Sequence, residues 1–157
     1  MFGSIASCDA SVQSDRIGIG IVSHDFSLSI GFDIAVPGGY SNKVELLGAL
    51  IAGYLVRSDT TIFVDNKSSV DEMNMIVESL DHGLKHVGKR IINRVSNNEI
   101  RFRWKSRRSI DIMRNADNLA KRAYFPYNAI RAMINRMELP LPSENEIRNY
   151  LTTYSWY

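Results

Sequence analysis

The sequence has little of two features that mark exported and membrane proteins, cysteine and long apolar runs. Its single cysteine, Cys8, excludes an intramolecular disulfide framework and fits a reducing compartment. The longest apolar run, over residues 46–56, falls well short of the roughly 20 residues that span a bilayer. No charged segment precedes the first apolar residues, as it would in an export signal. We therefore expect a cytoplasmic protein without a membrane contact.

Acidic residues are scarce in one part of the chain, although the formal net charge is only +2. Residues 1–84 contain four Lys or Arg and eleven Asp or Glu, whereas residues 85–108 contain nine basic residues and one acid, Glu99. Such a cationic stretch suits a polyanion, because each neutralised phosphate releases counterions. A solvated helix face followed by an edge strand explains the same pattern, so charge alone leaves both interpretations open.

Alternating apolar residues and turn residues predict the order of the elements. Three runs with period-two alternation, separated by short polar turns, predict an antiparallel meander of strands. The predicted strands are residues 4–12, 16–24, 27–34, 60–65 and 99–106, the predicted helices are 43–56, 68–80, 82–96 and 114–124, and the predicted loops include 37–42 and 107–113. This order predicts an α/β fold with a five-stranded mixed sheet, three antiparallel strands followed by two parallel ones, flanked by helices.

The chain length suits one such domain, which we place at residues 1–126. Residues 127–157 are predicted to form a helical extension that packs on or beside this domain. An amphipathic pattern predicts a helix over 128–139, and Ser143 with Glu146 forms a capping box for a last helix. Self-association or a partner contact through the extension is left open.

Four carboxylates fall at or near the ends of the predicted elements. Asp9 lies on the first strand, Glu45 in the first turn of the apolar helix, Asp65 directly after the run IFV, and Asp117 at the start of the late helix. Each of them alone is more often a cap or a turn acid. Four carboxylates on one edge of a sheet would repel one another unless they bind a cation, and Mg²⁺ prefers such hard oxygen ligands.

The same residues resemble the type 1 ribonucleases H. SCDASV carries the family's strand-borne Asp, SNKVELLGAL is similar to its Asn-x-x-Glu-Leu segment, VDNKSSV to its strand-ending Asp, and NADNLAKRA to its Ala-Asp-x-Leu-Ala helix. Order and spacing match over residues 5–124. The resemblance implies a ribonuclease H-like fold in which Asp9, Glu45, Asp65 and Asp117 are the catalytic ligands of two Mg²⁺ ions, which Mn²⁺ can replace. The implied activity is endonucleolytic hydrolysis of the RNA strand of an RNA·DNA hybrid, leaving 5′-phosphate ends.

The resemblance also implies contacts with the substrate. Asn42 matches the family's Asn that contacts the RNA minor groove, where the 2′-hydroxyl distinguishes RNA from DNA, and it can equally serve as a helix N-cap. Ser11, Tyr40 and Lys67 take further substrate positions. Arg107 stands near the place where the family often has a mobile His that assists product release.

Two departures from the family pattern keep alternatives open. Ala10 follows the first Asp, where the family usually has Gly, and the loop around Arg107 contains no His. The chain could therefore be another nuclease of the superfamily, for example a junction-resolving enzyme, or a hybrid-binding module without activity. The proofreading exonucleases are disfavoured because Asp9 is followed by Ala10 and Ser11 rather than by the Asp-x-Glu pattern. The presence of all four acids argues against a loss of activity.

Overall fold

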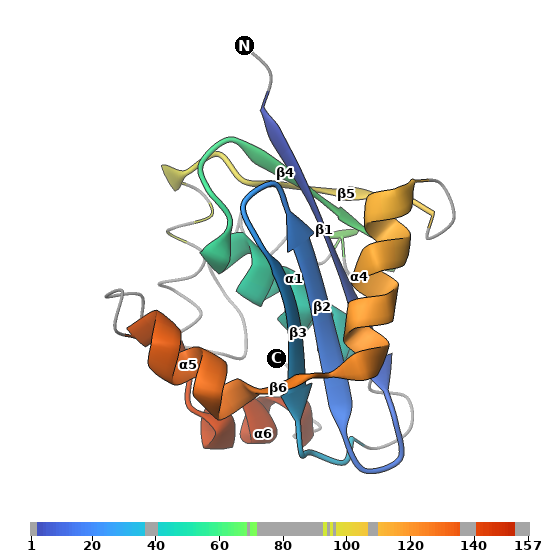
Figure 1. Ribbon diagram of the computed structural model, residues 1–157, viewed down its shortest axis with the longest axis vertical. Helices are drawn as coiled ribbons and strands as arrows, with labels where there is room; N and C mark the ends of the chain where they lie inside the picture. Colours follow the sequence, from blue (N-terminus) through green and yellow to red (C-terminus); the bar gives the residue numbers. More distant parts are fainter. Residues whose placement is uncertain are drawn as a thin grey trace.

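The computed structural model shows an α/β protein in which a mixed sheet is flanked by helices, and this confirms the predicted fold class (Figure 1). It describes residues 3–36, 41–68, 70–71, 93, 95, 97–106, 110–135 and 141–152. The elements are β1 (Ser4–Val12), β2 (Ile17–Ser23), β3 (Ser27–Phe32), α1 (Ser41–Leu55), β4 (Thr60–Val64), β5 (Arg101–Trp104), α4 (Asp111–Arg122), β6 (Phe125–Pro126), α5 (Tyr127–Asn135) and α6 (Glu144–Thr152). The predicted helices over 68–80 and 82–96, with much of the cationic segment, lie for the most part outside the described residues.

In the described part of the chain the sheet has six strands in the order β5-β4-β1-β2-β3-β6, so the predicted number of five is wrong. The predicted directions of the first five are confirmed: β1, β2 and β3 are antiparallel, whereas β4 runs parallel to β1 and β5 parallel to β4. The sixth strand, β6, pairs in parallel with the edge of β3 through Ile30 and Phe125. It was not predicted because its two residues, one of them Pro126, carry no alternating pattern.

One face of the sheet packs against α1 through large apolar side chains. Ile17, Ile19 and Ile21 of β2 are fully buried, and Ile19 lies against Gly48 of α1. The helix itself is apolar nearly all round, as the sequence predicts, and is buried from Leu46 to Tyr54. This layer contains most of the hydrophobic core.

The opposite face is lined by small residues, which lets α4 approach the backbone closely. A Cβ added at Gly18 would lie 1.9 Å from the carbonyl oxygen of Ala120, and one at Gly20 would lie 2.1 Å from that of Ala116. Real Cβ atoms do not come so close, so only glycine fits at these two positions. Helix α4 therefore rests on the backbone of β2.

Two serine hydroxyls anchor α4 to the sheet at its two ends. Ser7 Oγ donates to the carbonyl of Ile112 (2.7 Å), and Ser29 Oγ donates to the carbonyl of Leu119 (2.6 Å). Helix α4 begins at Asp111, so residues 111–113, predicted as loop, are helical. This earlier start was not predicted, because the hydroxyl that anchors it, Ser7 Oγ, belongs to a distant strand.

Helix α4 ends at Arg122, and the chain then turns to form β6. Ala123 adopts a left-handed conformation (φ 47°) that stops the helix. The N–H of Tyr124 then donates to Ser29 Oγ (2.8 Å), which directs the chain along β3. The helix therefore ends before the predicted boundary at residue 124.

The C-terminal helices pack onto the same core as the sheet. The ring of Tyr127 stacks on Phe32 at a centroid distance of 4.6 Å, and its hydroxyl donates to the carbonyl of Pro142 (2.6 Å). The predicted capping box is confirmed, because the N–H of Glu146 donates to Ser143 Oγ (3.1 Å) and the N–H of Ser143 donates to Glu146 Oε1 (3.3 Å). Ile130, Ile134, Leu141, Ile147 and Leu151 complete this side of the core.

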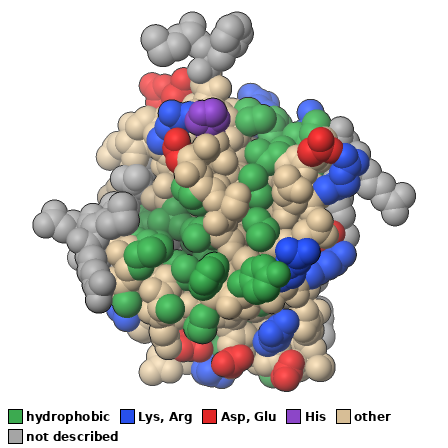
Figure 2. Space-filling model, in the orientation of Figure 1, with side chains coloured by type: hydrophobic (Ala, Val, Ile, Leu, Met, Phe, Trp, Pro, Cys, Tyr) green, Lys and Arg blue, Asp and Glu red, His purple; other side chains and the backbone are tan. Residues whose placement is uncertain are grey.

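Hydrophobic side chains also reach the surface around these elements. Tyr124, Phe125 and Met133 are among the exposed large hydrophobic residues. Figure 2 shows hydrophobic side chains gathering on the lower part of one face, where α5 and β6 lie in Figure 1. Among the described residues, no helix is long and apolar enough to cross a membrane.

Candidate metal site and nucleic-acid surface

Asp9 is the acid at the centre of the candidate site and lies in the middle of β1. It is 2% exposed, and its Oδ1 accepts a hydrogen bond from the N–H of Ala10 (2.9 Å). Its neighbour Cys8 points to the opposite face, into the core around α1. The crowded α4 face is a costly place for a negative charge unless the carboxylate is paired, hydrogen-bonded or bound to a cation.

Asp65 is brought beside Asp9 by the register of the two central strands. The parallel pairing of β1 and β4 aligns Ser7 with Phe63 and Cys8 with Val64. The next residues along the two chains are Asp9 and Asp65. Because residues in register on parallel strands point to the same face, both carboxylates belong to the face that carries α4.

Glu45 approaches the same place from α1, on the other side of β1. Gly48 lies over Asp9, since a Cβ added at Gly48 would be 3.9 Å from the carbonyl oxygen of Asp9. Glu45 precedes Gly48 by three residues and so lies about one turn away on the same side of the helix. Burial raises the pKa of the Cys8 thiol well above its ordinary value, and the negative charges of Glu45 and then Asp9 add to this increase. Both carboxylates therefore lie close enough to Cys8 to raise the pKa of its thiol.

Asp117 is carried over the sheet by α4, next to the contact with Gly20. Gly20 pairs with Asp9 in the register of β1 and β2, and Ala116 lies directly on Gly20. Because α4 runs from Asp111 to Arg122, Asp117 lies in the middle of the helix and not at its start, which corrects the expected position. Its Oδ2 forms an ion pair with Lys121 Nζ at 3.0 Å, and its side chain is 14% exposed.

The backbone thus places Asp9, Asp65 and Asp117 on or over the α4 face of the sheet, whereas Glu45 comes from α1 on the opposite face. Their side chains do not form a finished ion-binding cage: among the described residues, no three side chains of Asp, Glu, His or Cys form a group that could hold a metal ion. The donor set itself fits Mg²⁺, because it consists of carboxylate oxygens only. Binding would require the side chains to turn toward one another, and Asp117 to leave Lys121.

A cationic surface lies beside these acids, on the strands that α4 leaves uncovered. Alternation places Phe63, Arg103 and Lys105 on one face of β4 and β5, and Lys105 Nζ lies 5.1 Å from the centre of the Phe63 ring. Arg101, from the same row, is held by Asp59 (2.8 Å) and by Thr61 (3.1 Å). Arg103 is exposed, so Arg103 on β5 and Lys105, directly after β5, are the two cations best placed here for an external anion.

The predicted substrate residues are described only in part. Ser11 is half-buried on β1, two residues beyond Asp9 and on the same face. Lys67 is exposed, two residues after Asp65. Asn42 lies in the first turn of α1, where its backbone alone is described, and Tyr40 and Arg107 lie outside the described residues.

Two residues of this region received no role from the sequence. Lys43, in the first turn of α1, is only 4% exposed although it carries an ammonium group. The sequence signal that could have pointed to Lys43 is its position two residues before Glu45. Phe63 was read only as a strand residue, and its contact with Lys105 depends on the pairing of two strands that lie 40 residues apart in the sequence.

No protein-family model and no curated protein matches this sequence. The fold is compatible with a ribonuclease H-like arrangement, and the family remains a proposal.

Proposed function

We propose that this protein is a metal-dependent endonuclease of the ribonuclease H type that cleaves the RNA strand of an RNA·DNA hybrid. The observation that supports the proposal is the register of β1 and β4, whose last pair is Cys8 and Val64, the residues directly before Asp9 and Asp65. Two acids at adjacent buried or half-buried positions of a sheet are unfavourable without a cation between them. The order and directions of the first five strands are compatible with the proposed fold.

In this proposal the four carboxylates hold two Mg²⁺ ions, and the surrounding chain holds them in place. Asp9 is the most rigidly held of the four, because it lies within a strand that is paired on both sides. Asp117 is held by the contact between α4 and Gly20. Bound Mg²⁺ would supply the acidity that activates a water molecule and stabilises the leaving 3′ oxygen.

The cationic residues of β5 support a nucleic acid as the substrate. Arg103 and Lys105 lie one strand away from Asp65, and each offers an N–H donor to a phosphate. The aromatic ring of Phe63 lies beneath Lys105, so this surface combines charge with an apolar base. The choice of RNA over DNA rests on Asn42 and on the resemblance, through contact with the 2′-hydroxyl.

The test is cleavage of labelled RNA·DNA hybrid by the full chain with Mg²⁺ or Mn²⁺, together with double-stranded RNA, double-stranded DNA and a four-way DNA junction. We expect cleavage of the RNA strand of the hybrid, and its loss in Asp9→Asn and in Asp65→Asn. Asp15→Asn, in the exposed turn between β1 and β2, is the matched control and should retain activity. Full activity in Asp9→Asn, with unfolding curves like those of the wild type, would contradict the proposal.

A second function, binding of a hybrid without cleavage, is favoured by the side-chain arrangement. Among the described residues no three acidic, His or Cys side chains form a metal-binding group, and Asp117 is paired with Lys121. Binding of the hybrid in EDTA, with no cleavage at any Mg²⁺ or Mn²⁺ concentration, would favour this function. Cleavage of the junction instead of the hybrid would assign the chain to another branch of the superfamily.

A further inference from the structure

A cavity of about 460 Å³ lies at the start of β1, away from the candidate metal site. The register pairs Ala6 with Ser23, the last residue of β2, so Ser4 and Ile5 extend beyond the end of β2. The cavity occupies this notch and is bordered by the turn after β2, by Arg57 and by the first turn of α4. Ile5 precedes Asp9 by four residues, a separation of about 13 Å along a strand.

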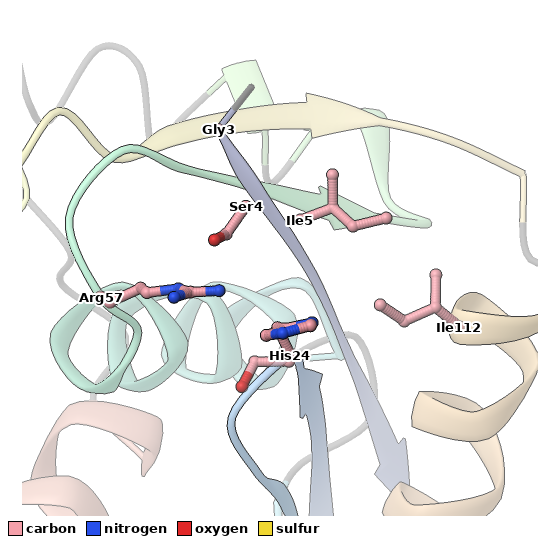
Figure 3. A pocket seen from close by; sticks show the side chains of 7 residues that line it. Gly3, Ser4, Ile5, His24, Arg57 and Ile112 are labelled. Carbon is pink, nitrogen blue, oxygen red and sulfur yellow. The ribbon is translucent and has the colours of Figure 1, made fainter. Parts of the chain in front are cut away.

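One side of the notch is polar. Figure 3 shows the side chains of Ser4, His24 and Arg57 near one another beside the start of β1. They come from three separate segments: the start of β1, the turn between β2 and β3, and the chain between α1 and β4. A guanidinium, an imidazole and a hydroxyl together offer hydrogen-bond donors and positive charge, which are the groups that bind a phosphate.

The turn that carries His24 is held in place by Ser23. Ser23 Oγ accepts hydrogen bonds from the N–H groups of Asp25 and Phe26, both at 3.1 Å, and the N–H of Ser23 donates to the carbonyl of Phe26 (2.8 Å). These bonds fix His24 and Asp25 relative to the end of β2. The imidazole is therefore presented to the notch by an ordered turn.

Asp25 in turn positions Arg57. Its Oδ2 forms an ion pair with Arg57 Nε at 3.4 Å. An arginine has five N–H donors, so a contact at Nε leaves the two terminal nitrogens for another acceptor. The second acid nearby, Asp59, is engaged by Arg101 at 2.8 Å. Asp25 offsets part of the charge of Arg57, and the terminal N–H groups of Arg57 are the donors that a ligand in the cavity would use.

The other side of the notch is apolar. Ile5 and Ile112 line it, and Figure 3 shows both on the opposite side of β1 from Arg57. Ile5 is 48% exposed, so its side chain is accessible to a ligand in the cavity. A ligand with a charged end and a flat, largely apolar end would contact both sides at once. The cavity volume lies in the range of small-molecule sites, roughly 300–1,000 Å³.

We propose that this cavity is a binding site for a nucleoside monophosphate, with the phosphate on Arg57, His24 and Ser4 and the base against Ile5 and Ile112. The site is independent of the proposed nuclease activity, since none of these residues belongs to the carboxylate group. The phosphate chemistry is shared by two sources, a free nucleotide and the backbone of a polynucleotide. The open but small notch, with polar and apolar walls on opposite sides of one strand, favours the free nucleotide.

The test is isothermal titration of the full chain in EDTA with adenosine 5′-monophosphate, inorganic phosphate, adenosine and a single-stranded oligonucleotide as separate probes. We expect the monophosphate to bind at least tenfold more tightly than either fragment, because it alone contacts both walls. Arg57→Gln and His24→Ala should each weaken its binding at least fivefold. Asp25→Asn should weaken it less, because Arg57 loses its orientation but not its charge. Arg148→Gln, an exposed arginine of α6, is the matched control and should bind like the wild type.

Equal affinity for the monophosphate in Arg57→Gln and in the wild type would overturn the proposal. Absence of binding by the monophosphate, with an oligonucleotide affinity that falls in Arg57→Gln, would assign the notch to a polynucleotide backbone and also overturn it. Thermal unfolding of each variant without ligand checks that the fold is kept. Loss of hybrid cleavage in Asp9→Asn, with unchanged monophosphate binding, would show that the two sites are separate.

Discussion

Replacing Gly20 with alanine tests how α4 and its carboxylate are held over the sheet. The new Cβ would lie 2.1 Å from the carbonyl oxygen of Ala116 and 2.6 Å from the backbone nitrogen of Ala120, whereas such contacts are essentially never under 3.0 Å. Both groups belong to the helix backbone, so no side chain can rotate out of the way. Helix α4 must therefore move away from the sheet by about 1 Å.

The cost of this movement follows from the contacts of α4. Overpacking costs about 1–3 kcal/mol, and the movement lengthens the hydrogen bonds from Ser7 and Ser29, now 2.7 and 2.6 Å, each of which contributes about 1 kcal/mol. We expect Gly20→Ala to lower the free energy of unfolding by about 3–5 kcal/mol. Urea denaturation followed by circular dichroism measures this change.

Gly48→Ala is the matched control, because the same methyl group is added on the other side of the sheet. Its nearest neighbour would be Ile19 Cγ2 at 3.5 Å, an ordinary van der Waals contact. Alanine is favoured over glycine within a helix by about 1 kcal/mol, so this variant should be as stable as the wild type or more stable. Wild-type stability in Gly20→Ala, or a similar loss in both variants, would refute the close packing of α4 on β2.

Three further predictions concern single side chains. The pKa of the buried Cys8 thiol is raised, so only the unfolded thiol ionises near its ordinary pKa of about 8.5. The contribution of this thiol to the free energy of unfolding should be constant below this pH and fall above it by up to about 1.4 kcal/mol per pH unit. Cys8→Ala, measured by urea denaturation from pH 7 to 10, should lack this part of the decrease. Lys121→Ala should remove the ion pair of Asp117 with Lys121, at a stability cost below about 0.5 kcal/mol. The Mg²⁺ concentration at which the melting temperature rises should then be about two- to threefold lower than in the wild type. An unchanged Mg²⁺ dependence would argue against Asp117 as a ligand. Ser143→Ala should lower the free energy of unfolding by about 1 kcal/mol because α6 loses its N-cap, and urea denaturation against Ser14→Ala, in an exposed turn, would detect it.

The predictable part of the fold is the part whose signals are local. The three antiparallel strands follow from alternation along each strand and from the polar turns between them, and all three are present. The capping box of Ser143 and Glu146 is also local and is confirmed. The parallel strands β4 and β5 could be predicted because an apolar helix precedes an apolar strand that has no neighbouring hairpin partner.

The errors lie where a distant residue decides the local structure. The start of α4 at Asp111 is fixed on the sheet by Ser7, and its end is followed by β6 because Ser29 receives the N–H of Tyr124. Neither serine is near α4 in the sequence. The predicted position of Asp117 at a helix start was wrong for the same reason, since the helix begins six residues before it.

The sequence by itself determined the types of the candidate site residues: four carboxylates at or near the ends of predicted elements, with a cationic strand between the third, Asp65, and the fourth, Asp117. Their side-chain chemistry and their place near element ends are properties of the chain alone. Only the tertiary structure decided that Asp65 comes beside Asp9, because the register of two parallel strands is set by their packing and not by either strand. It also decided that Asp117 lies over the sheet at Gly20, because a helix can approach a strand this closely only where no Cβ intervenes.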